Sequence, residues 1–177
     1  MKLSILICTL NERKALLERL LEVLRPQLTD DVEMLIDCDN REVTIGAKRQ
    51  RLIEKATGDY VCFVDDDDLV SQDYVSSILK AIETEPDCVA ITGIFTQNGA
   101  RPKPFYHSLQ CKRWFTENNV YYRTPNHLNP IKREIVLQVG YSDMRRGEDF
   151  DFSTRVFNLL KTETKIETSI YYYLSIY

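Results

Sequence analysis

The sequence lacks any apolar run long enough to cross a bilayer, and its 177 residues carry a formal net charge of only −4. The first absence argues against a transmembrane segment, because a spanning helix needs about 20 consecutive apolar residues. The slightly acidic balance argues against general nucleic-acid binding. Residues 1–8 also lack the length and the small-residue cleavage site of a signal peptide. We therefore expect a cytoplasmic protein without a membrane span or a nucleic-acid partner.

The five cysteines include no C-x-x-C pair, and histidine occurs only twice, as His107 and His127. Without paired cysteines, a structural zinc site is not expected. Widely spaced thiols, several of them in predicted strands, indicate free buried cysteines in a reducing compartment.

Hydrophobic residues make up 44% of the chain, which at this length is enough for one globular domain with a sizeable core. The first half alternates short apolar runs with amphipathic segments. Strands are expected at residues 2–8, 32–38, 59–64 and 88–95. Helices are expected between them, with caps at Asn11, Thr44 and Ser71. This alternation predicts a parallel sheet with helices on both faces.

The second half is less regular. Residues 97–104 contain Asn-Gly and two prolines, which indicates a loop or the end of a hairpin. Helices are expected at residues 131–139 and from Glu148 onward, followed by a β-rich segment at residues 166–176. No repeat or interdomain linker divides the chain, so a single domain over residues 1–177 is expected.

Four apolar residues, Val61 to Val64, lead directly into four aspartates, Asp65 to Asp68. The apolar run fits a buried parallel strand, and ligands of α/β proteins bind outside the carboxyl ends of such strands. Adjacent carboxylates raise one another's pKa, and a divalent cation with a preference for oxygen, Mg²⁺ or Mn²⁺, relieves their repulsion. A solvated acidic turn is the alternative. A calcium loop is not expected, because its glycine and distal glutamate are absent.

Two further segments carry candidate ligand-binding residues. Asp39 follows the second predicted strand, where a carboxylate can hydrogen-bond a base or a ribose. Lys48, Arg49 and Arg51 make the next helix basic. A basic helix is usually a solvated face, but near an acidic strand end it can offset the charge of a phosphate.

Several short motifs follow one another in a fixed order over roughly residues 2–160. They are Thr9-Leu10-Asn11-Glu12-Arg13, Asp39, Gly46-Ala47-Lys48-Arg49, Ala56-Thr57-Gly58-Asp59-Tyr60, Asp65 to Asp68, and Gly147-Glu148-Asp149. Their order and spacing together resemble the family 2 glycosyltransferases of the GT-A fold. The resemblance implies an α/β, Rossmann-like single domain with a mostly parallel central sheet flanked by helices. Residues 1–95 or so would bind the nucleotide-sugar, and residues 96–177 the acceptor.

The same resemblance implies an activity. A hexosyltransferase-type enzyme of this family moves a sugar from a nucleotide-sugar donor, commonly a UDP-sugar, to an acceptor hydroxyl with inversion of the anomeric centre. Mn²⁺ or Mg²⁺ neutralises charge on the leaving diphosphate, and a carboxylate on the opposite side takes the acceptor proton. A glycan, a lipid-linked molecule and a protein all stay open as the acceptor.

The resemblance also assigns roles to individual residues. Contacts with the nucleotide-sugar are expected from Thr9, Asn11, Arg13, Asp39, Arg49, Asp65 and Asp66. Asp67 is expected to bind the metal, with Asp66 as an alternative. The position of His127 in a loop just before the helix predicted at residues 131–139 keeps a donor- or metal-contact role open for it, although a loop histidine is more often structural or solvated. Asp149 would be the catalytic base and Glu148 would contact the acceptor. Trp114 and the tyrosines suit stacking on sugar faces, although core packing is the more common role of aromatic residues.

Two alternatives belong to other functional classes. A sugar-phosphate nucleotidyltransferase should carry a glycine-rich loop with Lys or Arg after the first strand, and residues 9–13 contain no glycine. A non-catalytic nucleotide-sugar-binding module would not need both Asp67 and Asp149, and both are present.

Overall fold

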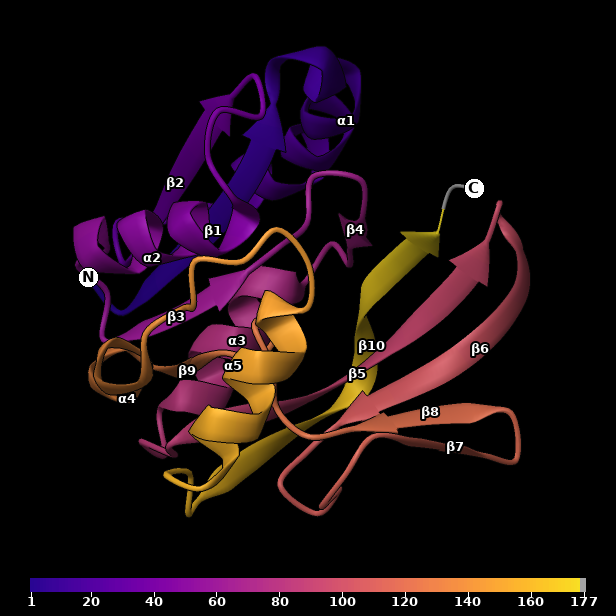
Figure 1. The fold of residues 1–177 in the computed structure, drawn as a ribbon. Helices are drawn as coiled ribbons and strands as arrows, with labels where there is room; N and C mark the ends of the chain where they lie inside the picture. Colours follow the sequence, from indigo (N-terminus) through magenta and orange to yellow (C-terminus); the bar gives the residue numbers. More distant parts are fainter. Residues whose placement is uncertain (176–177) are drawn as a thin grey trace.

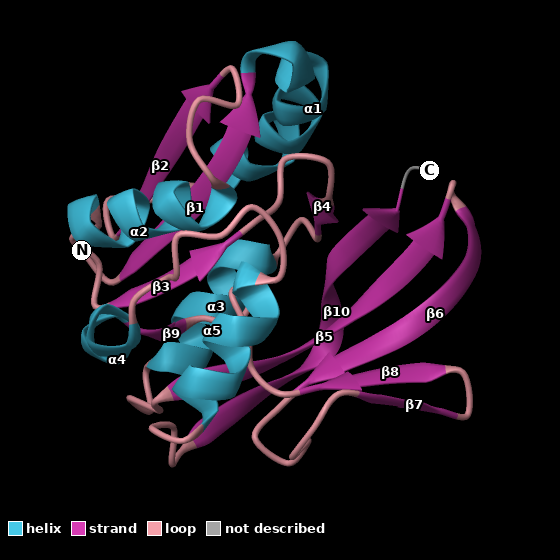
Figure 2. Cartoon of the chain, in the orientation of Figure 1, coloured by secondary structure: helices cyan, strands magenta, loops and turns pink. Residues whose placement is uncertain are grey.

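The computed structural model describes residues 1–175 of the chain. Within this range, helices flank a twisted, mixed β-sheet on both faces, as Figure 1 shows along the chain and Figure 2 by secondary structure. The predicted α/β class is confirmed.

Three parallel strands form the first part of the sheet. They are β1 (Leu3–Leu10), β2 (Val32–Asp39) and β3 (Tyr60–Phe63). Strand β1 lies between the other two, so that Leu3 is opposite Val32 on one side and Tyr60 on the other. Residues 3–9 of β1 are all buried, as the apolar run predicts for a strand covered on both faces.

Helices α1 (Lys14–Leu24), α2 (Ile45–Lys55) and α3 (Tyr74–Ile82) connect these strands and their neighbours. Side chains that alternate along β1 divide the core into two layers. Ile5 and Ile7 pack with residues of α1 and α3, whereas Leu6 packs with residues of α2 on the opposite face. Of these three helices, α1 and α3 cover one face of the sheet and α2 covers the other.

The helix starts match the prediction in one case of three. Thr44 caps α2 by accepting a 3.0 Å hydrogen bond from the backbone N–H of Ala47. The predictions for Asn11 and Ser71 are wrong. A 3₁₀ turn, η1 (Asn11–Arg13), precedes α1, and the N-cap of α3 is Asp73. Asn11 instead donates to Asn40 after β2, because both residues lie at the carboxyl edge of the parallel strands.

The second half adds two hairpins and a long last strand. They comprise β5 (Cys88–Gln97) with β6 (Ala100–His107), β7 (Phe115–Glu117) with β8 (Val120–Arg123), and β10 (Glu163–Ser175). The Asn98-Gly99 turn between β5 and β6 has positive φ angles of 49° and 72°, as this dipeptide predicts. β10 pairs in parallel with β5. Residue 176 of the predicted β-rich segment lies outside the described residues.

A short antiparallel strand that was not predicted lies within the central sheet. β9 (Ile131–Lys132) lies between β3 and β5 and is antiparallel to both. The buried side chain of Ile131 lies opposite Val61 and Cys88, so the segment pairs with strands before it turns into a helix. Helix α4 (Arg133–Val139) is therefore shorter than predicted, whereas α5 (Glu148–Phe157) begins at the predicted residue.

The sheet order over its main path is β2-β1-β3-β9-β5-β6-β8-β7, and β4 (Leu69–Val70) pairs with β10. A 3₁₀ turn, η2 (Arg25–Gln27), follows α1. All five cysteines are free, and Cys38 on the edge strand β2 is exposed. The prediction of buried thiols is therefore wrong at this one position.

Candidate active site

The four aspartates form a turn at the carboxyl end of β3, closed by a 3.1 Å hydrogen bond from the backbone N–H of Asp68 to the carbonyl oxygen of Asp65. Asp65 and Asp68 point to separate partners, whereas Asp66 and Asp67 converge on Arg13. This arrangement relieves the repulsion that four adjacent carboxylates would otherwise suffer.

Asp65 lies between two basic side chains. Its Oδ1 is 3.1 Å from Arg49 Nη2, and its Oδ2 is 3.3 Å from His127 Nε2. Burial by itself would raise the pKa of Asp65, but His127 and Arg49 outweigh it and hold the pKa well below its usual range. Asp65 is therefore ionised. Its contact with His127 joins the acidic turn to a loop 62 positions away in sequence.

Asp66 and Asp67 share one cation. Arg13 Nη2 lies 2.9 Å from Asp66 Oδ1 and 2.5 Å from Asp67 Oδ2. Asp66 is 2% exposed and accepts a 2.6 Å hydrogen bond from Thr9, and burial raises its pKa. The side chain of Asp67 is 34% exposed. Of these two carboxylates, Asp67 is therefore the one open to an added ligand.

Asp68 faces the opposite way, toward the last strand. It accepts hydrogen bonds from the hydroxyl of Tyr171 at 2.7 Å and from the backbone N–H of Leu174 at 2.8 Å. Burial, with a further contribution from the charge of Asp65, raises the pKa of Asp68 to about 8. Asp68 thus fastens the acidic turn to β10 and is not available to a ligand.

The acidic turn offers carboxylate oxygens, the ligands that a divalent cation such as Mg²⁺ or Mn²⁺ prefers. Among residues 1–175, no three His, Cys, Asp or Glu side chains are grouped as a metal site. Asp66 and Asp67 nevertheless converge on one positive group, Arg13, within hydrogen-bond distance. One or two carboxylates suit Mg²⁺ or Mn²⁺ when the remaining oxygen ligands come from substrate phosphates and water. The donor set therefore fits a cation that is held jointly with a diphosphate.

A cavity of about 400 Å³ opens beside the acidic turn, at the carboxyl ends of β1 and β2. We call it the basic cavity, because five of its lining residues are cationic: Arg13, Arg41, Lys48, Arg145 and Arg146. Thr9 and the N-terminal residues of α2 also line it. Cationic side chains next to a helix N-terminus favour a phosphate group.

Two predicted nucleotide contacts border the basic cavity without lining it. Asp39, at the end of β2, forms an ion pair with the buried Lys48, whose ammonium also donates to the carbonyl oxygen of Thr9. Burial would raise the pKa of Asp39, but the hydrogen bond from Lys48 lowers it. Asn11 is exposed and bonded to Asn40. Asp39 therefore fixes Lys48 in the cavity wall, and Asn11 does not line the cavity.

Arg49 and Glu148 lie beneath the acidic turn. Arg49 is 3% exposed, its Nε is 3.4 Å from Glu148 Oε1, and its guanidinium lies 4.7 Å from the ring centroid of Phe63. Burial would lower the pKa of Arg49, but Asp65 and the other neighbouring groups raise it overall. In this position Glu148 contacts Arg49 and lies inside the protein.

A second cavity, of about 340 Å³, is linked to the acidic turn through His127, which lines it and contacts Asp65. We call it the aromatic cleft, after five lining residues: Phe95, Phe105, Trp114, Tyr121 and Tyr173. Asp149, at the start of α5, and His127 also line it. The structure thus brings the predicted base into the same cleft as His127, whose Nε2 contacts the acidic turn.

Several lining residues were not predicted from the sequence. Arg41, Arg145 and Arg146 lie in loops with no recognisable motif, so only the fold reveals that they meet at the basic cavity. Arg123 of the aromatic cleft was likewise missed, although its place among aromatic residues was a signal.

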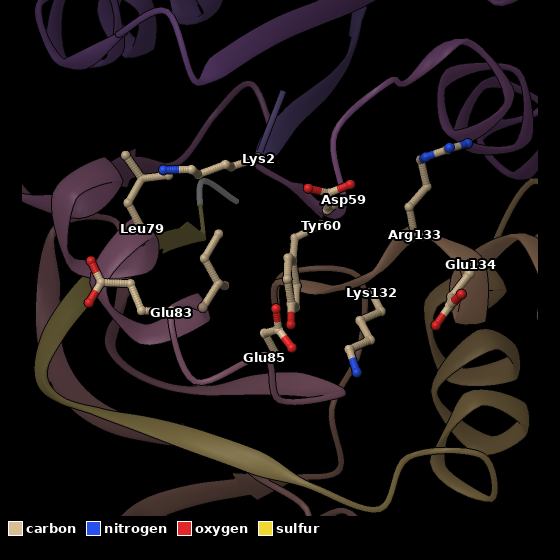
Figure 3. A pocket seen from close by; sticks show the side chains of 10 residues that line it. Lys2, Asp59, Tyr60, Leu79, Glu83, Glu85, Lys132, Arg133 and Glu134 are labelled. Atoms are coloured by element: carbon tan, nitrogen blue, oxygen red, sulfur yellow. The ribbon is translucent and has the colours of Figure 1, made fainter.

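A third cavity, of about 480 Å³, lies at the opposite ends of the strands and is lined by charged residues around Tyr60 (Figure 3). Lys2 and Asp59 precede β1 and β3, so this cavity lies at the amino ends of the strands. None of the predicted site residues lines it. Ligands of open α/β sheets bind at the carboxyl ends, so we assign the site to the basic cavity and the aromatic cleft.

The family of the chain follows from its similarity to known proteins. A family model described as "Glycosyl transferase family 2" matches residues 35–140, more than half of the chain. The chain belongs to this family. It is 30% identical over 130 residues to a glucosyl-dolichyl phosphate glucuronosyltransferase from Haloferax volcanii, covering 69% of this chain and 41% of that protein.

A second relative is the succinoglycan biosynthesis protein ExoM from Rhizobium meliloti, 26% identical over 156 residues, or 81% of this chain and 48% of that protein. The chain spans less than half the length of both relatives. Its fold is similar to that of S. aureus TarS 1-349, with a TM-score of 0.74, 16% identity and coverage of 98% of this chain and 60% of that one. The GT-A fold is thereby confirmed.

The same TarS fragment in complex with UDP-GlcNAc gives a TM-score of 0.74 at 16% identity, covering 99% of this chain and 59% of that chain. Over residues 1–175, no helix combines the length and the apolar character that crossing a membrane requires.

Proposed function

We propose that the protein is an inverting glycosyltransferase that uses a nucleotide-sugar donor, with a UDP-sugar as the first candidate, together with Mn²⁺ or Mg²⁺. The observation that carries the proposal is that the acidic turn contacts lining residues of two cavities of different chemistry. Arg13 links the turn to the basic cavity, and His127 links it to the aromatic cleft that contains Asp149. A donor and an acceptor would meet at this turn.

The basic cavity would hold the nucleoside diphosphate. Arg13 and Lys48 line it together with three further arginines, and this excess of positive charge suits a diphosphate. Lys48 is held in place by Asp39, so part of the binding surface is formed before a ligand arrives. Structures of the similarly folded TarS fragment in complex with UDP-GlcNAc and with UDP support a uridine nucleotide as the first candidate.

Asp67 would contribute to holding the divalent cation, with Asp66 next to it. When bound, such a cation supplies charge neutralisation to the leaving diphosphate. Arg13 now neutralises both carboxylates, and it would turn toward the phosphates when a cation takes its place. The chain therefore offers few ligands of its own, which predicts weak metal binding until a nucleotide is present.

Asp149 would act as the general base on the acceptor side. It lines the aromatic cleft at the first turn of α5, where the helix dipole favours an ionised carboxylate. An ionised carboxylate can take the proton of an acceptor hydroxyl as the oxygen attacks the anomeric carbon, and the nucleoside diphosphate departs from the opposite side. His127 would orient Asp65 between the two substrates.

A ligand screen tests the donor half of the proposal. The melting temperature of the protein is measured with UDP, ADP, GDP and CDP, each with and without Mn²⁺. A ligand that binds only the folded state raises the melting temperature by mass action. UDP with Mn²⁺ should therefore give the largest increase in melting temperature. If no nucleotide raises the melting temperature in the presence of metal, the proposal is wrong.

Donor hydrolysis separates the remaining alternatives. A transferase should release UDP slowly from a UDP-sugar when Mn²⁺ is present, with water as the acceptor. A non-catalytic binding module would bind the donor without releasing UDP. A nucleotidyltransferase would instead form a nucleotide-sugar from a nucleoside triphosphate and a sugar 1-phosphate.

A further inference from the structure

Among the residues that the structure describes, Arg123 is the cation of the aromatic cleft without an acidic partner. Its guanidinium carbon lies 5.1 Å from the ring centroids of both Trp114 and Tyr121. Nη1 donates to the carbonyl oxygens of Phe115 and Tyr122, at 2.9 and 2.8 Å. Among residues 1–175, no Asp or Glu forms an ion pair with it.

Three other cations at the site, in contrast, form ion pairs with carboxylates. Lys48 and Arg49 are each about 4% exposed at the side chain, and each is paired with a carboxylate, Asp39 and Asp65 respectively. Arg13 is paired as well. Covered charges are usually compensated, because removing an ion from water is costly. Arg123 departs from this pattern although it is half-buried and lines a cavity.

The positive charge of Arg123 extends into the cleft. Burial lowers the pKa of Arg123, and no carboxylate is among the groups that oppose this effect. The pKa of the neighbouring His107 is lowered to about 3, first by burial and then by the charges of His127 and Arg123. Asp149 also lines the cleft, but among residues 1–175 neither it nor any other carboxylate pairs with Arg123, so the guanidinium is open to an anionic ligand.

The ring beside Arg123 is firmly held. Trp114 Nε1 donates a 2.9 Å hydrogen bond to Thr124 Oγ1, which is in turn 2.6 Å from the hydroxyl of Ser153 on α5. Phe150, the residue after Asp149, packs edge-on against Trp114 with ring centroids 5.1 Å apart. Trp114 and the predicted base are thus positioned by the same helix. A rigid aromatic face of this kind needs little ordering when a ligand packs on it.

From this arrangement we infer that the aromatic cleft binds an acceptor saccharide that carries an anionic group, a carboxylate or a phosphate, opposite Arg123. The apolar face of a sugar ring would pack on Trp114 or Tyr121, and the anionic group would meet the guanidinium. A hydroxyl of the same saccharide would then lie near Asp149. This inference rests on the proposed function and adds to it the chemical class of the acceptor.

The only tryptophan of the chain is Trp114, so its fluorescence reports directly on the cleft. Methyl β-D-glucuronide, glucose 1-phosphate and methyl β-D-glucoside are titrated against the protein, with and without UDP and Mn²⁺. We expect at least one acidic sugar to bind about tenfold or more tighter than the neutral glucoside, as a charge-assisted hydrogen bond allows. The better of the two acidic sugars identifies carboxylate or phosphate as the anion. Equal binding of all three, or no binding, overturns the inference.

Two variants locate the effect. Arg123→Gln should abolish the preference for the acidic sugar, while its affinity for the neutral glucoside stays the same. Arg113→Gln makes the same change at an exposed residue beside Trp114 that does not line the cleft, and it should keep the preference. A preference that persists in Arg123→Gln overturns the inference. If that variant does not fold, Arg123→Lys, which keeps the charge, should retain a weakened preference that sodium chloride diminishes.

Calorimetry with UDP and Mn²⁺ on the same samples separates this inference from the proposed function. Arg123→Gln should leave the UDP affinity unchanged, because Arg123 does not line the basic cavity. A wild-type protein that binds UDP but does not prefer an acidic sugar would refute the acceptor class alone. A protein that does not bind UDP would refute the proposed function.

Discussion

Arg49 Nη2 on α2 lies 3.1 Å from Asp65 Oδ1 in the acidic turn, and both side chains are largely covered, with exposures of 4% and 28%. Arg49 also contacts Glu148 at 3.4 Å and lies over the ring of Phe63. One guanidinium thus compensates two carboxylates from different parts of the chain. This ion pair fixes the acidic turn to α2, on the face of the sheet that also carries α5.

We predict that Arg49→Met destabilises the fold, because it leaves Asp65 and Glu148 without their shared cation. Removing one partner of a buried pair typically costs about 3–5 kcal/mol. We expect about 3 kcal/mol, the lower end of that range, because Asp65 is partly exposed to water. Urea denaturation monitored by circular dichroism measures the change in the free energy of unfolding.

Arg51→Met provides the matched control on the same helix. Arg51 pairs with Asp37 at 2.9 Å, but its side chain is 44% exposed. A solvated pair contributes about 1 kcal/mol or less. Equal losses in the two variants would contradict the argument that burial makes the Arg49 pair important.

The sequence predicted the position of the acidic turn, because an apolar run followed by carboxylates marks a strand end in an α/β fold. It could not predict which aspartate faces which partner. Asp68 bonds to Tyr171, 103 residues away, and Asp65 contacts His127, 62 residues away. Such assignments depend on how β10 and the loop before β9 return to the turn. Local pattern does not encode that path.

The missed strand β9 has a similar explanation. Ile131 to Val139 has a helical pattern, but the first two residues pair with Tyr60 and Val61 in the sheet. Tertiary pairing therefore outweighs local propensity at this boundary. Arg145 and Arg146 were missed for a related reason, because a loop that borders a cavity carries no periodicity from which its contacts can be read.

A second prediction concerns the pH dependence of stability. The pKa of His107 is lowered from 6.5 to about 3, mainly by burial, so the folded state keeps it neutral when the unfolded state would protonate it. Its contribution to stability is present above about pH 6.5 and is lost as the pH falls toward 3. The slope is at most about 1.4 kcal/mol per pH unit.

His107→Gln should flatten this part of the stability profile, because glutamine does not titrate. Urea denaturation at several pH values between 4 and 7 compares the slopes of the wild type and the variant. If both proteins lose stability equally over this range, His107 is not the residue responsible.

A third prediction concerns the metal. Asp67→Asn should reduce the UDP affinity measured with Mn²⁺ to the value measured without it, because Asp67 is the exposed carboxylate of the turn. The free energy of unfolding of Asp67→Asn should change little, since Asp67 lies outside the core. Isothermal titration calorimetry of UDP, with and without Mn²⁺, gives both affinities.

Asp68→Asn is the control for that experiment. The pKa of Asp68 is raised to about 8, so the native residue is mostly protonated at neutral pH and asparagine resembles it in shape and charge. We expect it to keep the metal-dependent affinity for UDP. If Asp67→Asn keeps that affinity and Asp66→Asn loses it, Asp66 is the ligand.

The last prediction concerns Asp149, which lines the aromatic cleft at the start of α5. Asp149→Asn keeps the size of the side chain and removes its ability to accept a proton. General-base catalysis typically contributes about 10²–10⁴-fold to a rate, so sugar transfer should slow by roughly that factor. Asp151→Asn, on the same helix but outside the cleft, should keep the turnover of each folded molecule.

Turnover and UDP affinity are measured on the same samples. Because Asp149 does not line the basic cavity, the UDP affinity should stay unchanged. Unchanged turnover would exclude Asp149 as the base, and a lost affinity for UDP would place it in the nucleotide site instead.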